Sequence, residues 1–338
     1  MSDTARLLDD TAERMLSRHF ATAQRGNAEA ESALLAEMVE AGLDLVLVPE
    51  DAGGLGAGVP EASAIAHRWG YHAAPGPIVE MLLSRELAAL PGAGIPVGAA
   101  LALVEDHRLA GDTWTAPALT ARANVTGAKA TAIVACLEGR VGRLVLARYD
   151  AVAGTKTSMA GESIALLDLR ANPAALHETA LPFEGFLAKG ALLTASASIG
   201  ATQRLLETAI EHANTRKQFG KPLGKFQAIQ HMLAEAAAEH VVAQAATRAA
   251  VAALDAGRLK PLAWRAAKMQ SALAATKVSA ATHQILGAIG FTEEHMLHHY
   301  SKRLWAWRDD WGREAILRRQ VGDAAVANAD GLWSFMVD

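Results

Sequence analysis

The sequence predicts a mainly α-helical protein in which a small β domain separates two helical parts. Long stretches toward both ends repeat apolar residues at intervals near 3.6, which is the period of a helix face. The middle of the chain instead carries short apolar runs between turns rich in glycine, aspartate and proline, a pattern typical of strands. The chain has 338 residues, enough for two or three domains, and 51% of them are hydrophobic, so we expect a sizeable core.

Residues 1–95 are expected to form an N-terminal helical domain. Leu34 and Met38 recur at helical spacing, and Pro60 suits the first turn of a later helix. Between these helices the run LDLVLVPE predicts a short extended piece, and the glycine stretch at 53–58 predicts a turn. That glycine stretch has neither the GxGxxG spacing nor the β-α-β surroundings of a dinucleotide-binding loop, so we interpret it as a loop before a helix.

Residues 96–183 are expected to form a small β domain. The runs ALALV, RLVLARYD and SIALLDLR have the character of strands, and VTGAK, LEGRVG and ANP separate them. Cys136 is the only cysteine, so the chain can form no internal disulfide. It lies in the apolar run IVACL and is expected to be a small buried hydrophobic group.

Residues 184–338 return to long helical patterns and predict a C-terminal helical bundle. Three stretches each place apolar residues on one helix face: Leu192, Ile199 and Leu206; Phe226, Ile229 and Leu233; Leu262, Met269 and Leu273. Helices joined by short connections pack as neighbours, which is the geometry of a bundle.

The composition argues against several functional classes. The formal net charge is −4 and the isoelectric point is near 6.3, so nucleic-acid binding is not expected. No apolar run reaches membrane-spanning length, and the first residues carry acids without the apolar core of a secretion signal. We therefore expect a cytoplasmic protein that does not associate with a membrane.

Two local patterns raise the question of a metal or a nucleophile. His295 and His299 are spaced to share a helix face, as some zinc ligands do, but no acid completes an HExxH pattern and no third ligand is evident. We expect an exposed or interface helix face there and no metal. The sequence contains no GxSxG, so covalent hydrolysis is not expected.

The stretch TRKQFGKPLGKFQ, at 215–227, combines a basic cluster with a turn between two helices. Arg216 offers a planar fork that suits phosphate oxygens, Gln218 can both donate and accept hydrogen bonds, and Phe219 offers a flat apolar face. Two interpretations remain open on the residues alone. The cluster either grips a phosphorylated ligand or complements the dipole at a helix C-terminus.

Four motifs, in order along the chain, resemble those of the acyl-CoA dehydrogenase superfamily. GLDLVLVPEDAGGLG resembles its N-terminal signature, VTGAK a turn of its middle β domain, RKQFGKPLGKFQ its flavin-binding signature, and HQILGAIGFTEEHMLHHYSKR its second C-terminal signature. The resemblance covers nearly the whole chain, which is similar to short bacterial members. It implies an N-terminal helical domain, a shortened middle domain that is β-barrel-like, and a C-terminal four-helix bundle.

The resemblance implies that FAD is the cofactor and that two subunits share each flavin. Arg216 would hold the pyrophosphate of FAD, and Gln218 and Phe219 would contact its ribose and adenine region. The basic stretch would then be a phosphate grip built across a subunit interface.

A second set of residues is implied to serve the FAD of a neighbouring subunit. Gln284, Gly287 and Ala288 would line its ADP portion. Ala288 stands where the family has a second glycine, and its methyl group narrows the room for close backbone approach. Since a monomer would hold half-sites only, the resemblance implies a homotetramer or a mixed tetramer with a paralogous subunit.

The family's catalytic base is a glutamate shortly before a glycine near the C-terminus. Aligning YSKRLWAWRDDWGRE without gaps puts Trp311 at that position, and an indole cannot accept a proton from carbon. Relatives that take the glutamate from an earlier helix carry it near Gly190, which also has no carboxylate. The candidate substitutes are Asp310, Asp309 and Glu314, and on a continuous helix Glu314 would share the face of Trp311.

The middle domain also departs from the family pattern, because Thr131 and Ile133 stand where a flavin-facing tryptophan and threonine are usual. Two functions follow. The first is an FAD-dependent acyl-CoA dehydrogenase of fatty-acid or steroid side-chain metabolism, which desaturates an acyl-CoA thioester and passes electrons to an electron-transferring flavoprotein. The second is a catalytically degenerate subunit that cradles FAD in a heterotetrameric acyl-CoA dehydrogenase. A third hypothesis is a flavin oxidase relative that acts on a non-CoA substrate.

Overall fold

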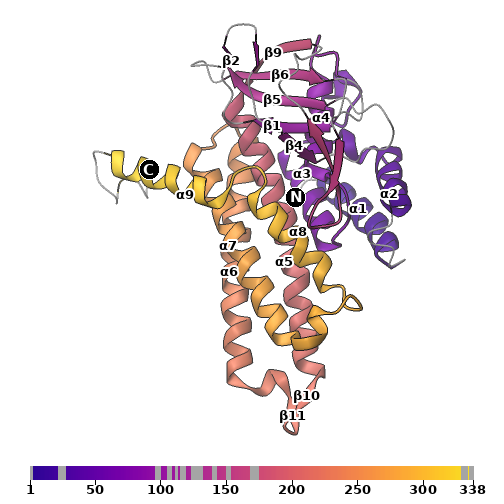
Figure 1. The fold of residues 1–338 in the computed structure, drawn as a ribbon, viewed down its shortest axis with the longest axis vertical. Helices are drawn as coiled ribbons and strands as arrows, with labels where there is room; N and C mark the ends of the chain where they lie inside the picture. The colour runs from indigo at the N-terminus through magenta and orange to yellow at the C-terminus, as the bar shows by residue number, and fades with distance from the viewer. Residues whose placement is uncertain are drawn as a thin grey trace.

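The computed structural model of the protein describes residues 3–21, 28–95, 100–104, 109–110, 113–114, 119–122, 132–138, 143–149, 154–167, 175–328 and 334. Within these residues, a helical N-terminal part, a β-sheet and a set of long helices follow one another along the chain (Figure 1).

The described N-terminal part is helical throughout. Its elements are α1 (Asp3–Ala21), α2 (Ala28–Glu40), η1 (Leu43–Leu45), η2 (Glu50–Ala52), α3 (Val59–Tyr71) and α4 (Ile78–Ala88). The extended piece predicted in LDLVLVPE is wrong, because the 3-10 helices η1 and η2 and the turns between them fill this stretch. Gly42 enters η1 with a φ of 68°, and the fully buried Asp44 meets the guanidinium of Arg85 at 2.5 Å. This ion pair requires an inward-facing acid, which the strand-like apolar pattern did not indicate.

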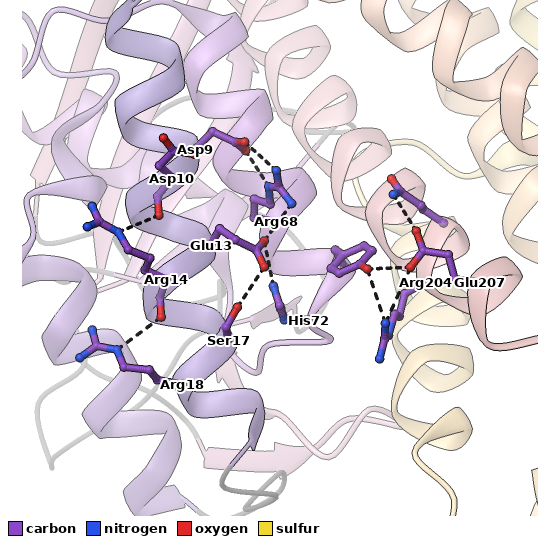
Figure 2. Close-up of polar contacts among 12 residues, drawn as sticks. Asp9, Asp10, Glu13, Arg14, Ser17, Arg18, Arg68, His72, Arg204 and Glu207 are labelled. Atoms are coloured by element: carbon purple, nitrogen blue, oxygen red, sulfur yellow. Dashed lines mark hydrogen bonds and ion pairs between the residues drawn. The ribbon is translucent and has the colours of Figure 1, made fainter. Parts of the chain in front are cut away.

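An ion-pair cluster fastens α1 to α3 (Figure 2). Arg68 of α3 donates to the two carboxylate oxygens of Asp9 at 2.7 Å each and to Glu13 Oε2 at 2.8 Å. His72, just past the end of α3, contacts the same Glu13 oxygen at 3.1 Å. Forked arginine–carboxylate pairs of this kind are directional, so they fix how the two helices lie against each other.

The middle of the chain forms a seven-stranded sheet in the order β7-β8-β4-β1-β5-β6-β9, with a separate two-stranded pairing of β2 and β3. The strands are β1 (Ala100–Val104), β2 (Leu109–Ala110), β3 (Thr113–Trp114), β4 (Leu119–Arg122), β5 (Ala132–Glu138), β6 (Arg143–Tyr149), β7 (Gly154–Thr157), β8 (Ser163–Leu167) and β9 (Ala175–Pro182). β1 and β5 run parallel, and the other neighbours in the sheet run antiparallel. This small sheet agrees with the predicted shortened β domain.

Long helices make up the rest: α5 (Phe183–Thr215), α6 (Gln227–Asp255), α7 (Pro261–Leu286), α8 (Leu297–Asp309) and α9 (Glu314–Ala327). α5, α6 and α7 lie alongside one another, and α8 packs on α5 and α7 (Figure 1). The sheet lies at one end of this bundle and the short hairpin of β10 (Lys217–Gln218) and β11 (Lys221–Pro222) at the other (Figure 1). The fold is thus mainly helical with a small sheet, as predicted. None of the described helices is long and apolar enough to cross a bilayer.

α3 and α5 approach each other so closely that glycine is needed on both sides. A Cβ on Gly70 would lie 1.8 Å from the carbonyl oxygen of Ala197, and a Cβ on Gly200 would lie 1.9 Å from that of His67. Backbone therefore packs on backbone at this crossing. Side chains from the N-terminal helices, the sheet and the bundle form one continuous hydrophobic core around it.

Candidate functional site

The basic stretch singled out in the sequence forms a hairpin at the far end of α5. Its two short strands pair so that Phe219 and Gly220 make a two-residue loop. Both residues have positive φ, 51° and 82°, as a tight hairpin turn of this length requires. Glycine adopts this backbone freely, whereas Phe219 is strained in it and is 90% exposed. The loop therefore presents an aromatic ring to solvent.

Arg216 lies at the base of this hairpin, as the C-cap residue of α5. Its backbone N–H donates to His212 O at 2.8 Å, and its carbonyl oxygen accepts from the N–H of Leu223 at 2.9 Å, so the backbone is held on both sides. Its guanidinium is exposed. Three lysines of the hairpin and the following turn are exposed as well: Lys217, Lys221 and Lys225.

We call residues 216–225 the cationic hairpin. In the part of the chain that the structure describes, none of its four cations forms a salt bridge. The dipole of α5 accounts for a cation at the helix C-terminus, but not for three more beyond it, because the effect fades within one turn. The cationic hairpin is therefore a concentrated positive surface without a described counter-ion of its own.

The second predicted set lies where α7 ends. Gly287 has a φ of 63° and a ψ of −139°, a conformation that glycine alone adopts readily, and there α7 gives way to the 3-10 helix η4 (Gly287–Phe291). Gln284 and Ala288 are exposed on either side of this glycine. The exposed methyl of Ala288 leaves the backbone turn at Gly287 accessible from solvent.

Gln284 also lines a surface groove of about 720 Å³ between α6 and α7. The other lining residues are mostly small or charged: Met232, Glu235, Ala236, Ala238, Glu239, Lys277, Ala280 and Ala281. A groove of this size lies within the range of small-molecule sites. Arg216, Gln218 and Phe219 do not line this groove.

The structure corrects the histidine prediction. α8 begins at Leu297, so His295 precedes the helix and does not share a helix face with His299. His295 Nδ1 instead accepts the backbone N–H of Leu297 at 3.1 Å. Burial lowers the pKa of His295, and nearby histidines, His212 first among them, lower it further. Among the described residues no three His, Cys, Asp or Glu side chains are grouped to hold a metal ion.

Gly190 and Trp311, the two positions that the resemblance aligns with the family's glutamate, lie in direct contact. Gly190 belongs to α5, and a Cβ built on it would lie 2.1 Å from Trp311 Cε3 and 2.4 Å from Cδ2. Both residues are buried. The two alternative positions that the sequence suggests for one glutamate are therefore neighbours in the fold. We call the space around these two residues the reaction chamber.

Trp311 fills the reaction chamber with its indole ring. The indole Nε1 donates to Glu80 Oε1 of α4 at 3.0 Å, and the ring meets Phe186 edge-on with 5.7 Å between centroids. Sequence reasoning did not single out Glu80, which lies 231 residues from Trp311. Its position as an acid in the first turn of α4 was the only local signal.

The chain changes direction sharply at Trp311. α8 ends at Asp309, Trp311 has a φ of 53°, and Gly312 follows with a φ of 120° before α9 begins at Glu314. The continuous helix on which Glu314 would share a face with Trp311 is therefore wrong. A left-handed backbone is strained for a residue as large as tryptophan.

A buried lysine explains where α8 stops. Lys268 of α7 is 1% exposed, and its ammonium donates to the carbonyl oxygens of Trp307 at 2.8 Å and Arg308 at 3.1 Å. These carbonyls belong to the last turn of α8, which would otherwise leave them without partners. The ammonium thereby replaces the backbone N–H groups that a further helical turn would have supplied, and the chain can turn inward at Trp311.

The candidate carboxylates differ in their surroundings. Glu314 accepts from Arg318 Nε at 2.7 Å, an ion pair between neighbouring turns of α9. Asp309 is exposed beside Arg308, with 3.7 Å between their charged groups. Asp310 is half-buried and adjacent to Trp311 in sequence. Thr131 lies outside the described residues, as does the side chain of Ile133.

Comparison with known proteins places these features in a family. The family described as acyl-CoA dehydrogenase, C-terminal domain, matches residues 183–326. Acyl-CoA dehydrogenase IpdE2 of Mycobacterium tuberculosis is 29% identical over 310 residues, which are 88% of this chain and 89% of that protein.

Solved structures show the same fold. The Tcur3481-Tcur3483 steroid ACAD G363A variant superposes with a TM-score of 0.81 at 22% identity and covers 97% of this chain and 99% of its own. The ChsE4-ChsE5 complex of Mycobacterium tuberculosis gives a TM-score of 0.78 at 17% identity, with 97% and 98% covered. The match of residues 183–326 and these likenesses over most of the chain support the acyl-CoA dehydrogenase superfamily, whose named members are flavin oxidoreductases.

Proposed function

We propose that this protein is one subunit of an FAD-dependent acyl-CoA dehydrogenase assembly, and that its partner subunit supplies the catalytic carboxylate. The reaction of the assembly is α,β-desaturation of an acyl-CoA thioester. A carboxylate removes the proton next to the thioester carbonyl. FAD, when bound, accepts the hydride from the adjacent carbon. This chain's contribution is to hold FAD and to close the site.

The cationic hairpin is the observation that carries the proposal. Arg216 and its three neighbouring lysines are exposed without a described salt bridge, on a backbone fixed at both ends. A planar guanidinium matches two oxygens of a diphosphate at once, and such charge-assisted hydrogen bonds are about twice as strong as neutral ones. Gln218 and the exposed ring of Phe219 stand beside this charge, where they suit a ribose hydroxyl and an adenine face.

The second set, at Gln284, Gly287 and Ala288, supports an assembly of several subunits. Its Gln284 lines a groove that no residue of the cationic hairpin lines. On this proposal each chain offers parts of two cofactor sites and completes neither alone. The names of the Tcur3481-Tcur3483 protein and of the ChsE4-ChsE5 complex describe pairs of different chains. We propose a mixed tetramer of this kind, with an electron-transferring flavoprotein as acceptor and an acyl-CoA with a steroid-derived acyl group as substrate.

The chemistry of the reaction chamber supports placing the base in the partner. Gly190 and Trp311 occupy both glutamate positions of the family, and neither side chain accepts a proton from carbon. Glu314 is paired with Arg318 at 2.7 Å within α9, so its carboxylate is already engaged there.

A second candidate function rests on Asp310. This carboxylate is half-buried and adjacent to Trp311, so the chain alone could act as an acyl-CoA dehydrogenase with Asp310 as an unusual base. Changing Asp310 to Asn would then abolish flavin reduction by acyl-CoA in the isolated chain. Turnover by the isolated chain that survives Asp310→Asn would remove this candidate.

The test is to produce the chain alone and together with a paralogous acyl-CoA dehydrogenase subunit that has the usual glutamate. The proposal predicts that flavin is retained, and bleached by acyl-CoA, only in the joint preparation. In that preparation Arg216→Ala should weaken FAD binding about tenfold or more, the loss expected of one charged hydrogen bond. Arg319→Ala, the same charge change on exposed α9, is the matched control. A joint preparation without flavin would refute the proposal.

A further inference from the structure

We infer that Trp311 is a built-in plug that keeps acyl thioesters out of this chain's own reaction chamber. The inference rests on the proposed function, which identifies the space around Gly190 and Trp311 as the place where a family member's glutamate meets its substrate. It also predicts how many substrate molecules bind. In a mixed assembly each pair of subunits binds one acyl-CoA, and that acyl-CoA binds in the partner subunit. We call Trp311 with its supports Gly190, Phe186 and Glu80 the indole plug.

Gly190 makes room for the indole. It lies inside α5, where glycine is unfavourable, and its φ is not positive, so the backbone conformation does not require glycine. A Cβ at this position would fall within 2.1–2.4 Å of three ring atoms of Trp311, much closer than packed atoms approach. The ring therefore lies directly on the backbone of α5. A glutamate at position 190 and an indole at 311 exclude each other.

Glu80 and Phe186 hold the indole in this place. The hydrogen bond from Nε1 to Glu80 Oε1 is 3.0 Å long, and Trp311 is only 7% exposed. A buried indole N–H without an acceptor would be unfavourable. Glu80 supplies that acceptor, so burial of the ring leaves no donor unsatisfied. The edge-on contact with Phe186 adds an aromatic pair with favourable geometry.

The backbone on either side of Trp311 is also fixed. Lys268 binds the last carbonyls of α8 before it, and after it Gly312 packs against Leu317 of α9, where a Cβ would lie 3.1 Å from Cδ1. Trp311 itself keeps a φ of 53° that is strained for its size. A strained conformation persists only where its surroundings hold it, so the fold actively retains the ring in the chamber.

The plug is distinct from a cavity that also contacts Phe186. A cavity of about 320 Å³ has Phe186 in its wall, together with the ion pair of Glu86 and Lys189. Neither Gly190 nor Trp311 lines this cavity. An acyl chain lodged there would not meet either position from which the family's base acts.

Trp311→Gly tests the plug on the isolated chain, without flavin or partner. Glycine adopts a φ of 53° without strain, so the change removes the ring and leaves the turn intact. It should open an apolar cavity of indole size that binds added indole, as engineered apolar cavities bind flat aromatic molecules. Indole at ten times its Kd should raise the melting temperature of the variant by roughly 2–4 °C.

Two proteins serve as controls for the indole measurement. The wild-type chain should show no shift, because its own ring fills the space. Trp305→Gly removes a 39% exposed indole from α8, the helix that precedes Trp311, and should also show none. Stabilisation of the wild-type chain by indole equal to that of Trp311→Gly would overturn the plug.

Gly190→Ala gives a second test that does not depend on the folding of Trp311→Gly. Its methyl should displace the indole, shift tryptophan emission toward that of a solvated ring, and lower the melting temperature by about 1–4 °C. Gly185→Ala is the matched control on α5, since its Cβ would meet only Pro182 Cγ at 3.3 Å. Unchanged emission and melting in Gly190→Ala would overturn the plug.

The stoichiometry is measured in the mixed assembly by titration with a non-reactive acyl-CoA analogue. We expect one analogue per pair of subunits for the wild-type protein and two for the assembly with Trp311→Gly. Two per wild-type pair would overturn the plug while leaving the cofactor proposal standing. Failure to retain FAD would refute the proposed function but leave the indole result intact, because that result needs neither FAD nor partner.

Discussion

The cationic hairpin and the reaction chamber show opposite physical character within one chain. The hairpin exposes the guanidinium of Arg216, three lysines and a phenylalanine that is 90% exposed. The chamber is buried, and its indole N–H donates to a carboxylate of the same chain. One region therefore presents charged groups to solvent, and the other is filled by an aromatic side chain of this chain.

This difference separates two tasks that a self-sufficient dehydrogenase performs together. Unpaired charge on a rigid support is suited to an external anion, whereas packed aromatic surface is suited to stability alone. Changes to the hairpin should alter cofactor binding and leave folding nearly untouched. Changes to the chamber should alter folding first.

The largest effect on stability is expected from Lys268→Met, which tests whether the chamber's turn depends on a single buried ammonium. Two carbonyls of α8 would lose their donor, and we expect a loss of about 3 kcal/mol in the free energy of unfolding. Urea unfolding measures it. Lys277→Met removes an exposed lysine from the same helix and should change stability by less than about 0.5 kcal/mol. Equal effects of the two changes would contradict the capping role.

A pH effect should follow from His67, which lies at the close crossing of α3 and α5. Burial, and to a smaller extent Arg68, lower its pKa to about 4. Because the unfolded chain binds this proton more readily, stability present above pH 6.5 is lost as pH falls toward 4. Between pH 7 and pH 5 the loss amounts to about 2 kcal/mol.

His67→Phe should remove this slope in the pH dependence of urea unfolding. His231→Phe, at an exposed position on α6, should leave the slope as it is. If both variants retain the slope of the wild-type protein, the acid sensitivity does not originate at the α3–α5 crossing.

Raising the salt concentration should affect the cationic hairpin and leave the indole plug unchanged. Exposed charges are screened, so raising ionic strength from about 0.05 M to 0.5 M should weaken FAD binding in the mixed assembly about tenfold. The dry indole plug should be insensitive to the same change, as judged by tryptophan emission. Salt-independent FAD affinity would argue against binding through the cationic hairpin.

The smallest stability effect is expected at Phe219. Phe219→Gly relieves a strained φ but adds freedom to the unfolded chain, so the free energy of unfolding should stay within about 1 kcal/mol of wild type. FAD binding by the mixed assembly should nevertheless weaken, since the exposed ring is lost. Phe226→Leu, behind the hairpin, is the comparison: its ring meets Phe219 edge-on and lies under the ammonium of Lys221.

Sequence patterns over short stretches predicted the order of helical and β parts and the position of the hairpin turn. Helical and strand periods gave the helical–β–helical order, and the turn RKQFGKPLG is a hairpin because glycine and proline are placed for it. The roles of Arg216 and Gln284 toward FAD remain predictions. What local patterns could not supply was the break after α8, since the lysine that causes it lies on α7, 39 residues away.

The content of the reaction chamber was also hidden from local patterns. Trp311 was identified as a departure from the family, but its hydrogen bond to Glu80 and its contact with Gly190 join α4, α5 and the α8–α9 turn. Such contacts depend on how whole helices pack. The run LDLVLVPE was misjudged for a similar reason, because Asp44 is turned inward by Arg85 from α4.

The crossing at Gly70 and Gly200 has a practical consequence for dissecting this protein. The backbone of α5 packs directly against α3. A fragment beginning near residue 183 would therefore lack the helix that covers Ala197 and its neighbours. Such a fragment would expose a long apolar surface to solvent and should be recovered from cells mostly in insoluble form. Anyone wishing to study the bundle separately would do better to produce α3 and α5 in one polypeptide.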